Sequence, residues 1–270
     1  MLADALTFPA FNPVLIQIGP LAIHWYGISY IVGLVGGWAY ARRLVANTAL
    51  WQVQPGAPAL LDDLLVWVAI GVIVGGRLGQ VLLYEPSVYF SDPILIFETW
   101  KGGMAFHGGI AGAAIAVIAF ARRHHVPVLS YLDIASAVAP IGLFFGRLAN
   151  FVNGELWGRV TDVPWAFIFP NTDGLPRHPS QIYEASLEGL ALFVLLFVMT
   201  RCGALKRPGL VAGTFGIGYC LARSFCEFFR EPDGLIFGGP LTVGMAYSLP
   251  MLAIGLGLVG YALARRRATA

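Results

Sequence analysis

The chain has 270 residues, of which 57% are hydrophobic and only 12% are charged, with a net charge of +2. A soluble domain carries about 25% charged residues, so the composition excludes an ordinary soluble protein and predicts a polytopic membrane protein. The net charge gives no support for nucleic-acid binding, because the basic residues follow a membrane pattern. Three cysteines (Cys202, Cys220 and Cys226) lack metal-binding or redox spacing and are interpreted as small apolar residues in or beside spans.

The first 20 residues have no basic segment, which argues against a cleaved signal peptide, and they could instead form a short amphipathic piece on the membrane. A membrane-spanning helix needs about 20 apolar residues. Seven stretches qualify, the third being the weakest: 22–42, 62–84, 104–121, 132–151, 182–200, 209–229 and 241–264. We therefore predict an all-α fold in which residues 1–270 form a single transmembrane domain. Its long connections are residues 85–103 and 152–181, which we expect on the outer, periplasmic side.

Lysine and arginine residues set the orientation, because loops rich in them stay in the cytoplasm. With seven spans, ten of the 17 fall on one side: Arg42, Arg43, Arg122, Arg123, Arg201, Lys206, Arg207, Arg265, Arg266 and Arg267. Four fall on the other side (Lys101, Arg159, Arg177 and Arg230), and Arg77, Arg147 and Arg223 lie within spans. The N-terminus should therefore face out and the C-terminus the cytoplasm.

Small residues at four-residue spacing predict close packing of helix backbones. The repeats are Gly33 and Gly37, then Gly71, Gly75 and Gly79, and then Gly209 and Gly213. We assign them no chemistry.

The polar residues that are costly in a membrane all fall at the outer end or in the outer half of their predicted spans. An arginine near the centre of a membrane helix costs roughly 2.5–3.5 kcal/mol on insertion scales, so a chain that keeps one usually has an anion, a pore or an ion pair for it. A channel or proton pathway would need polar groups through the full thickness of the membrane. Because the inner halves are almost purely apolar, we expect a cavity open to the outer leaflet.

One group of these residues lies in GRLANFVNGELWGR (146–159), at the end of an apolar run. A lone arginine at such a place, here Arg147, often snorkels to the interface and has no further role. The neighbouring Asn150, Asn153 and Glu155 favour a functional site instead.

A second group lies on one helical face: Tyr219, Arg223, Glu227 and Arg230. Steps of four, four and three residues place them together. One alternative is an ion-pair ladder that only locks the bundle, since buried charges are normally paired. It would not explain Arg147 and Arg77, which have no acidic residue four positions away. The planar guanidinium of an arginine can donate two parallel hydrogen bonds to the oxygens of a phosphate. In the outer leaflet that phosphate belongs to a phospholipid head group.

Among the histidines, His107 is the most suggestive, because glycine pairs flank it in GGMAFHGG (102–109) and admit a ligand or a close backbone. A histidine with a pKa near 6.5 exchanges protons at neutral pH, although a structural role stays equally open for His107. His24 could anchor the interface beside two aromatic residues. His178 could be a hydrogen-bonding residue of a loop.

The stretch GRLANFVNGELWGR resembles the signature of the prolipoprotein diacylglyceryl transferase family, Gly-Arg-x-(Gly/Ala)-Asn-Phe-x-Asn-x-Glu-x-x-Gly. Four further stretches also look like this family, in family order along nearly the whole chain: HWYG (24–27), GGMAFHGG (102–109), RHPSQIYE (177–184) and FFREPD (228–233). One departure is visible, since only NTDG separates FIFP from LPRHPSQ where some members carry a longer periplasmic insertion. This difference concerns substrate entry.

The resemblance implies a multi-pass enzyme of the bacterial plasma (inner) membrane, with its active site towards the periplasm. Such an enzyme moves the diacylglyceryl group of phosphatidylglycerol onto the lipobox cysteine of a prolipoprotein, the first step of lipoprotein maturation, and uses no metal or nucleotide cofactor. The family's phosphatidylglycerol-binding arginine falls on Arg147. Its other functionally important positions fall on Tyr26, His107, Asn150, Glu155, Gly158, Tyr219 and Arg223.

The chemistry can also be argued from the residues. A thiol with a pKa near 8.5 is mostly protonated at pH 7, so a base such as His107 would help it to attack. Arginines aimed at the leaving phosphate would stabilise its growing charge. With the resemblance, we expect His107, Arg147, Arg223 and Tyr26 to be catalytic. We expect the substrates to be bound by Arg147, Asn150, Asn153, Glu155, Gly158, Tyr219, Arg230, His178 and Arg77. The group that accepts the thiol proton stays open.

Two other classes of protein stay open on the sequence. A transporter or scramblase of anionic lipids could use the same arginines, but it would need a route for the head group through the apolar inner halves. A non-catalytic lipid-binding scaffold would explain the arginine face, but not His107 and the Asn-x-x-Asn-x-Glu set.

Overall fold

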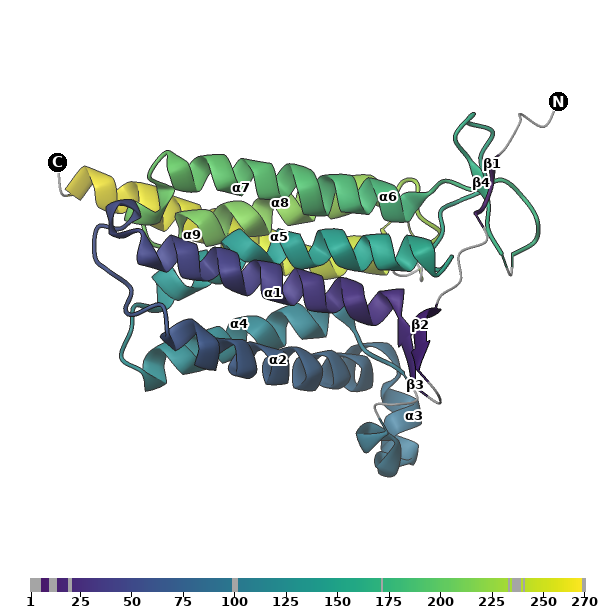
Figure 1. Ribbon diagram of the computed structural model, residues 1–270, viewed down its shortest axis with the longest axis horizontal. Coiled ribbons are helices and arrows are strands. Elements are labelled where there is room, and N and C mark those ends of the chain that lie inside the picture. Colours follow the sequence, from purple (N-terminus) through teal and green to yellow (C-terminus); the bar gives the residue numbers. More distant parts are fainter. Residues whose placement is uncertain are drawn as a thin grey trace.

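The computed structural model describes residues 6–9, 14–18, 21–98, 102–170, 172–232, 234, 239 and 241–268; the side chains of residues 18, 21–24, 26, 30 and 266–268 are not described. Seven long helical segments dominate the described chain (Figure 1). They are α1 (Trp25–Ala46), α2 (Leu60–Gly79), α4 (Phe106–Arg123), α5 (Val128–Val152), the segment from α6 to α7 (Ser180–Arg201), α8 (Leu210–Cys226) and α9 (Val243–Ala268). Each lies within a few residues of a predicted span, so the predominantly helical fold is confirmed.

Four of the described helices are long and apolar enough to cross a membrane: Leu60–Tyr84, Val128–Val152, Ser180–Arg201 and Val243–Arg265. Their outward faces carry exposed branched side chains such as Ile70, Val66 and Ile254. Such faces are unfavourable in water and suit contact with lipid chains. The protein is a multi-pass helical membrane protein.

Two helical segments contain wider π-helical turns. Residues Gln80–Tyr84 extend α2, and residues Ala185–Ala191 join α6 (Ser180–Glu184) to α7 (Leu192–Arg201). π-helical turns are rare and occur frequently at functional sites. The second one lies next to the polar site described below.

The N-terminal segment differs from the prediction of an amphipathic piece on the membrane. Where it is described, it forms short strands: β1 (Leu6–Thr7) pairs in parallel with β4 (Phe167–Ile168), and β2 (Val14–Ile18) pairs with β3 (Leu21–His24) as an antiparallel hairpin. The runs VLIQI and LAIH are rich in branched side chains that favour strands. The fold is therefore mostly helical but not purely so.

The remaining short elements connect the long helices. They are η1 (Thr48–Leu50), α3 (Pro86–Ser91), η3 (Pro93–Phe97) and η6 (Ala204–Lys206). The strands and α3 lie at one end of the bundle, and the C-terminus and the α1–α2 connection lie at the other (Figure 1).

Glycine contacts bring α2 and α4 close together. A Cβ atom at Gly112 would overlap the carbonyl oxygen of Gly71, and one at Gly75 would overlap that of Gly108. Gly213 of α8 meets α9 in the same way, since its Cβ would lie 2.7 Å from the carbonyl oxygen of Gly255. The predicted packing role of these glycines is confirmed.

Gly209 has a different role from the other predicted packing glycines. It adopts a φ of +93°, a conformation that glycine takes without steric cost, and it precedes the first residue of α8. Its N–H donates to a carboxylate oxygen of the buried Asp133 of α5 (2.7 Å), and the N–H of Ala212 donates to the other oxygen (2.8 Å). This carboxylate satisfies N–H groups that would otherwise lack partners at the start of a helix.

Candidate active site

Six charged side chains meet between α5, the α6–α7 segment and the end of α8. They are Arg147, Glu184, Glu188, Arg223, Glu227 and Arg230, and we call this set the charge cluster. Five of the six are buried, and the side chain of the sixth, Arg147, is 12% exposed. The cluster holds three arginines and three glutamates, so its formal charge is zero when all six are ionised.

Arg147 is paired with carboxylates of a different segment. Its Nε lies 3.3 Å from Glu184 Oε2, and its Nη2 lies 3.4 Å from Glu188 Oε2. Its guanidinium also lies over the ring of Phe106, with 5.6 Å between the Cζ atom and the ring centroid. The absence of an acidic residue four positions away was one argument for a phosphate partner. This argument fails, because the fold supplies the acids from the α6–α7 segment.

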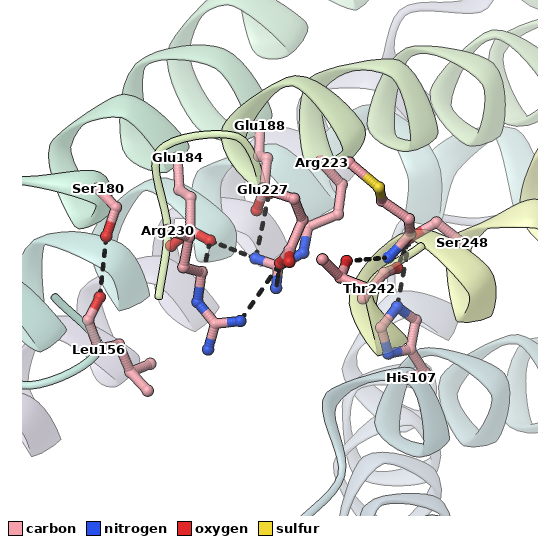
Figure 2. Close-up of polar contacts among 12 residues, drawn as sticks. His107, Leu156, Ser180, Glu184, Glu188, Arg223, Glu227, Arg230, Thr242 and Ser248 are labelled. Atoms are coloured by element: carbon pink, nitrogen blue, oxygen red, sulfur yellow. Dashed lines mark hydrogen bonds and ion pairs between the residues drawn. The ribbon is translucent and has the colours of Figure 1, made fainter. Parts of the chain in front are cut away.

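Arg223 is the centre of the cluster (Figure 2). It bonds Glu184 through Nη1 and Glu227 through Nη2, and its Nη1 lies 3.7 Å from Glu188 Oε1. Arg230 adds a contact of 3.3 Å to Glu227. The predicted helical face is confirmed for these residues, although α8 itself ends at Cys226 and the last two lie in the turn that follows.

The glutamates of the α6–α7 segment are the part of the site that the sequence analysis missed. Glu184 ends α6, and Glu188 lies in the π-helical turn; both side chains are fully buried. Two acids four residues apart inside an apolar span were a visible signal. Glu184 lies in the family-like stretch RHPSQIYE without an expected role, and Glu188 lies just beyond it.

The polar residues after Arg147 converge on Glu155. The side-chain amide of Asn150 donates to Glu155 Oε1 at 2.8 Å, and that of Asn153 donates to the same oxygen at 3.4 Å. The buried Gln181 of α6 donates to the backbone carbonyl of Glu155 at 2.6 Å. The end of α5 and the start of α6 are thus joined through Glu155.

The turn after Glu155 holds a strained residue. Leu156 has a φ of +58°, a left-handed conformation that costs a residue with a Cβ atom roughly 1–2 kcal/mol. Its carbonyl accepts a hydrogen bond from the buried hydroxyl of Ser180 at 3.0 Å (Figure 2). Ser180 and Gln181 therefore hold the turn that aims Glu155 at the two asparagines. The sequence pattern gave no sign of this strain.

Gly158 allows three segments to approach closely. A Cβ atom there would lie 2.5 Å from the carbonyl oxygen of Phe229 and 2.6 Å from that of His178. Its N–H donates to the carbonyl of His178 at 2.9 Å, and it forms an isolated β-bridge with Arg230. Gly158 thus serves the site by packing the loop against the segment that carries Arg230.

His107 lies in the first turn of α4, beside Phe106. Its Nε2 is 3.4 Å from the hydroxyl of Ser248 in α9 (Figure 2). The preceding Phe106 lies over Arg147 and is 5.7 Å from the ring of the buried Tyr219. The following glycine, Gly108, faces α2, so its small size serves helix packing.

Tyr219 adds a hydroxyl to the interior of the site. Its side chain is fully buried, and within the part of the chain that the structure describes its hydroxyl has no hydrogen-bond partner. A buried group of this kind is costly unless a ligand or water satisfies it.

Two predicted binding residues lie apart from the charge cluster. Arg77 donates to the backbone carbonyls of Leu95, Ile96 (2.8 Å), Gly102 (2.6 Å) and Gly103 (2.9 Å), so it holds the loop after α3 against α2. His178 contacts the hydroxyl of Tyr183 at 3.1 Å, and burial lowers the pKa of the His178 imidazole, which disfavours its charged form.

The side chain of Tyr26, predicted to be catalytic, lies outside the described residues, as does that of His24. The backbone places Tyr26 in the first turn of α1.

Fold and site together define a helical membrane protein with a charge-balanced arginine–glutamate cluster near one end of its bundle. The family model for prolipoprotein diacylglyceryl transferase matches residues 13–261. The chain belongs to the prolipoprotein diacylglyceryl transferase family. This confirms the identification made from the sequence motifs, and with it the assignment as a transferase.

The chain is similar to several bacterial proteins named phosphatidylglycerol–prolipoprotein diacylglyceryl transferase. It is 58% identical to the protein of Methylocella silvestris, over 96% of this chain and 97% of the relative. It is 55% identical to that of Nitrobacter winogradskyi, over 94% of this chain and 89% of the relative. It is 54% identical to that of Brucella canis, over 94% and 92%.

The strained turn yields a testable prediction. Ser180→Ala removes the hydrogen bond to Leu156 and should lower the stability of the purified protein by about 1 kcal/mol. Adding Leu156→Gly should restore the thermal unfolding temperature, because glycine adopts a positive φ without steric cost. Ser186→Ala is the matched control, since its exposed hydroxyl bonds only the preceding helical turn. If Ser180→Ala unfolds at the same temperature as Ser186→Ala, or if the double variant unfolds no later than Ser180→Ala, then Ser180 does not hold Leu156 in its strained conformation.

Proposed function

We propose that this protein transfers the diacylglyceryl group of phosphatidylglycerol to the lipobox cysteine of prolipoproteins. The observation that carries the proposal is the position of Arg147. It is the most exposed arginine of the charge cluster, and Phe106 connects its guanidinium to the turn that holds His107. A phosphate-binding group and a proton acceptor thus border one region, as the reaction requires. Membership of the transferase family supports the same conclusion.

The reaction exchanges a carbon–oxygen bond for a carbon–sulfur bond. The cysteine thiolate attacks the glyceryl carbon that is bonded to phosphate oxygen, a thioether forms, and glycerol phosphate leaves. The leaving group changes from a singly charged diester to a monoester with up to two charges. Arg147 and Arg223 stabilise this growing charge, because prearranged cations at a buried site favour the transition state.

His107 takes the thiol proton in this proposal, and Tyr219 donates its hydroxyl to the bound lipid. Asn150, Asn153 and Glu155 form the wall between the lipid and the loop, and Arg230 holds Glu227 in the cluster. Arg77 and His178 act indirectly, by fixing the loops around the site. Tyr26, at the start of α1, completes the catalytic set.

We further propose that all seven long helices span the inner membrane as one domain. The site then faces the periplasm, and residues 85–103 and 152–181 lie on that side. The basic residues in the last turns of α1, α4 and α7 support this orientation, because such residues stay on the cytoplasmic side. The C-terminus would be cytoplasmic as well.

Purified protein incubated with labelled phosphatidylglycerol and a lipobox peptide should transfer the label to the peptide cysteine. A peptide with serine in place of that cysteine should receive none, because the hydroxyl is a far weaker nucleophile than a thiolate at neutral pH. Label on both peptides would indicate a different reaction. Binding of lipid with no transfer to either would favour a lipid-binding scaffold.

The orientation can be tested with reporters. A fusion after Ala270 should report a cytoplasmic C-terminus, and a tag before Met1 should be accessible from the periplasm. A periplasmic reading for both ends would mean that one of the seven helices does not cross the membrane. The first candidate is α4, because it corresponds to the weakest predicted span and is not among the four described helices that are long and apolar enough to cross.

Arg147 and His107 should differ in what they contribute. Arg147→Lys keeps the charge but loses the fork, so turnover should fall strongly. Arg147→Ala should also weaken lipid binding, by roughly tenfold to a hundredfold. His107→Gln should leave lipid binding near normal while lowering transfer by roughly a hundredfold or more.

The measurement follows lipid binding and transfer rate on the same preparations from about pH 6 to 9. Raising the pH should partly rescue His107→Gln, because more of the peptide thiol, with a pKa near 8.5, ionises unaided. Loss of lipid binding as severe as in Arg147→Ala, or no rescue at high pH, would show that His107 is not the base.

A further inference from the structure

The charge balance of the cluster poses a problem for an anionic ligand. Three arginines face three buried glutamates, so the site holds no net positive charge when all are ionised. Adding a phosphate diester would leave one negative charge in excess in a poorly solvated region, which is costly. The phosphate and the glutamates therefore compete for the same arginine donors, so a phosphate that bonds an arginine has to exchange with a carboxylate there.

Arg147 is the arginine at which such an exchange is easiest. Its two ion pairs measure 3.3 and 3.4 Å, which is longer than the 2.7–2.9 Å of strong charge-assisted hydrogen bonds. Its side chain is 12% exposed, compared with 6% for Arg223 and 5% for Arg230. A ligand therefore reaches Arg147 with less displacement of protein than it would need at the other two.

The two carboxylates on Arg147 are not held equally well. Glu184 is also bonded by Arg223 and lies 3.8 Å from Arg230, so it joins all three arginines. Among the described residues, Glu188 has a contact of 3.4 Å to Arg147 and one of 3.7 Å to Arg223, both of them long for ion pairs. It lies in the π-helical turn Ala185–Ala191, where the backbone departs from regular α-helical geometry.

We propose that Glu188 is a built-in competitor for the phosphate group of the substrate. In the free protein its carboxylate occupies Nη2 of Arg147. The lipid phosphate takes this edge of the guanidinium, and Glu188 retreats towards Arg223. After transfer, Glu188 returns to Arg147 and helps to displace the more highly charged glycerol phosphate. Glu188 thereby lowers the affinity for the lipid and speeds the release of glycerol phosphate.

This inference rests on the proposed function and predicts a specific kinetic signature. Glu188→Gln removes the competing charge but keeps the shape of the side chain. Phosphatidylglycerol should then bind about tenfold more tightly, and added glycerol phosphate should inhibit more strongly by at least the same factor. KM should fall, and kcat should fall with it because the product leaves slowly. A residue that only supports the fold would raise KM or lower stability without strengthening product inhibition.

Glu184→Gln is the matched control, because it is the same change one helical turn away. It also removes a carboxylate charge from Arg147, but it loosens Arg223 and Arg230 as well, so both ligands should gain less affinity than they do with Glu188→Gln. Neutral diacylglycerol should bind equally to the wild type and to Glu188→Gln, since it carries no phosphate. If Glu188→Gln does not fold, Glu188→Asp provides the test, because the shorter side chain withdraws from Arg147 and should lower KM in the same direction.

Weaker or unchanged binding of glycerol phosphate and phosphatidylglycerol in the Glu188 variants would overturn the inference. The two proposals can fail separately. If no transfer occurs but anionic lipid and glycerol phosphate bind more tightly to Glu188→Gln, the proposed reaction is wrong and the competitor role stands. If transfer occurs but Glu188→Gln leaves both binding constants unchanged, the proposed reaction stands and the competitor role of Glu188 is wrong.

Discussion

The arrangement of the helices depends on one constraint: six ionisable groups between apolar helices must neutralise one another. Arg147, Arg223 and Arg230 cannot remain buried without Glu184, Glu188 and Glu227, because isolated charges are strongly disfavoured away from water. These groups come from α5, the α6–α7 segment and the end of α8, so the requirement for pairing fixes the three segments relative to one another. The same network presents Arg147 at its edge. The interaction that stabilises this end of the bundle therefore also positions Arg147, the group that we propose binds the lipid phosphate.

Packing and chemistry are connected in the surrounding parts of the structure. The glycine contacts between α2 and α4 set the position of the first turn of α4, and this turn carries His107 next to Phe106. In the same way Gly158 lets the loop approach Phe229 and thereby the segment of Arg230. A larger side chain in place of one of these glycines would shift His107 or Arg230 by displacing the backbone, without contacting either side chain. A loss of activity at such a position is therefore no proof of contact with substrate.

The sequence predicted the helices well, because long apolar runs have few alternatives in a membrane. It also predicted the face of Arg223, Glu227 and Arg230, since spacing within one helix determines which residues meet. It could not predict pairs between helices. Arg147 therefore seemed to lack an acidic partner, although Glu184 and Glu188 reach it across the bundle.

Three further features could not be predicted from the sequence: the conformation of Leu156, the N-terminal strands and the role of Arg77. The left-handed conformation of Leu156 arises because Ser180 and Gln181 bind the carbonyls of the turn, and these residues follow it by more than 20 positions. The N-terminal strands were missed because hydrophobicity alone does not separate a short strand from a surface helix. Arg77 was predicted to bind substrate because arginine suits phosphate. In the structure its N–H groups donate instead to backbone carbonyls of the loop after α3.

The length of α8 has a consequence for where the reaction takes place in the membrane. Its 17 residues correspond to about 25 Å at 1.5 Å per residue, which is less than the ~30 Å thickness of a hydrocarbon core. Asp133 holds its first turn and Glu184 holds Arg223 near its last, so the helix has little freedom to shift along its axis. If α8 spans the bilayer as proposed, with its start at the cytoplasmic boundary, Arg223 lies below the level of the outer head groups, near the glycerol and the ester bonds. Under the proposed function, the phosphate of the lipid then has to move below the head-group level to reach Arg223, and the peptide cysteine has to reach the same depth.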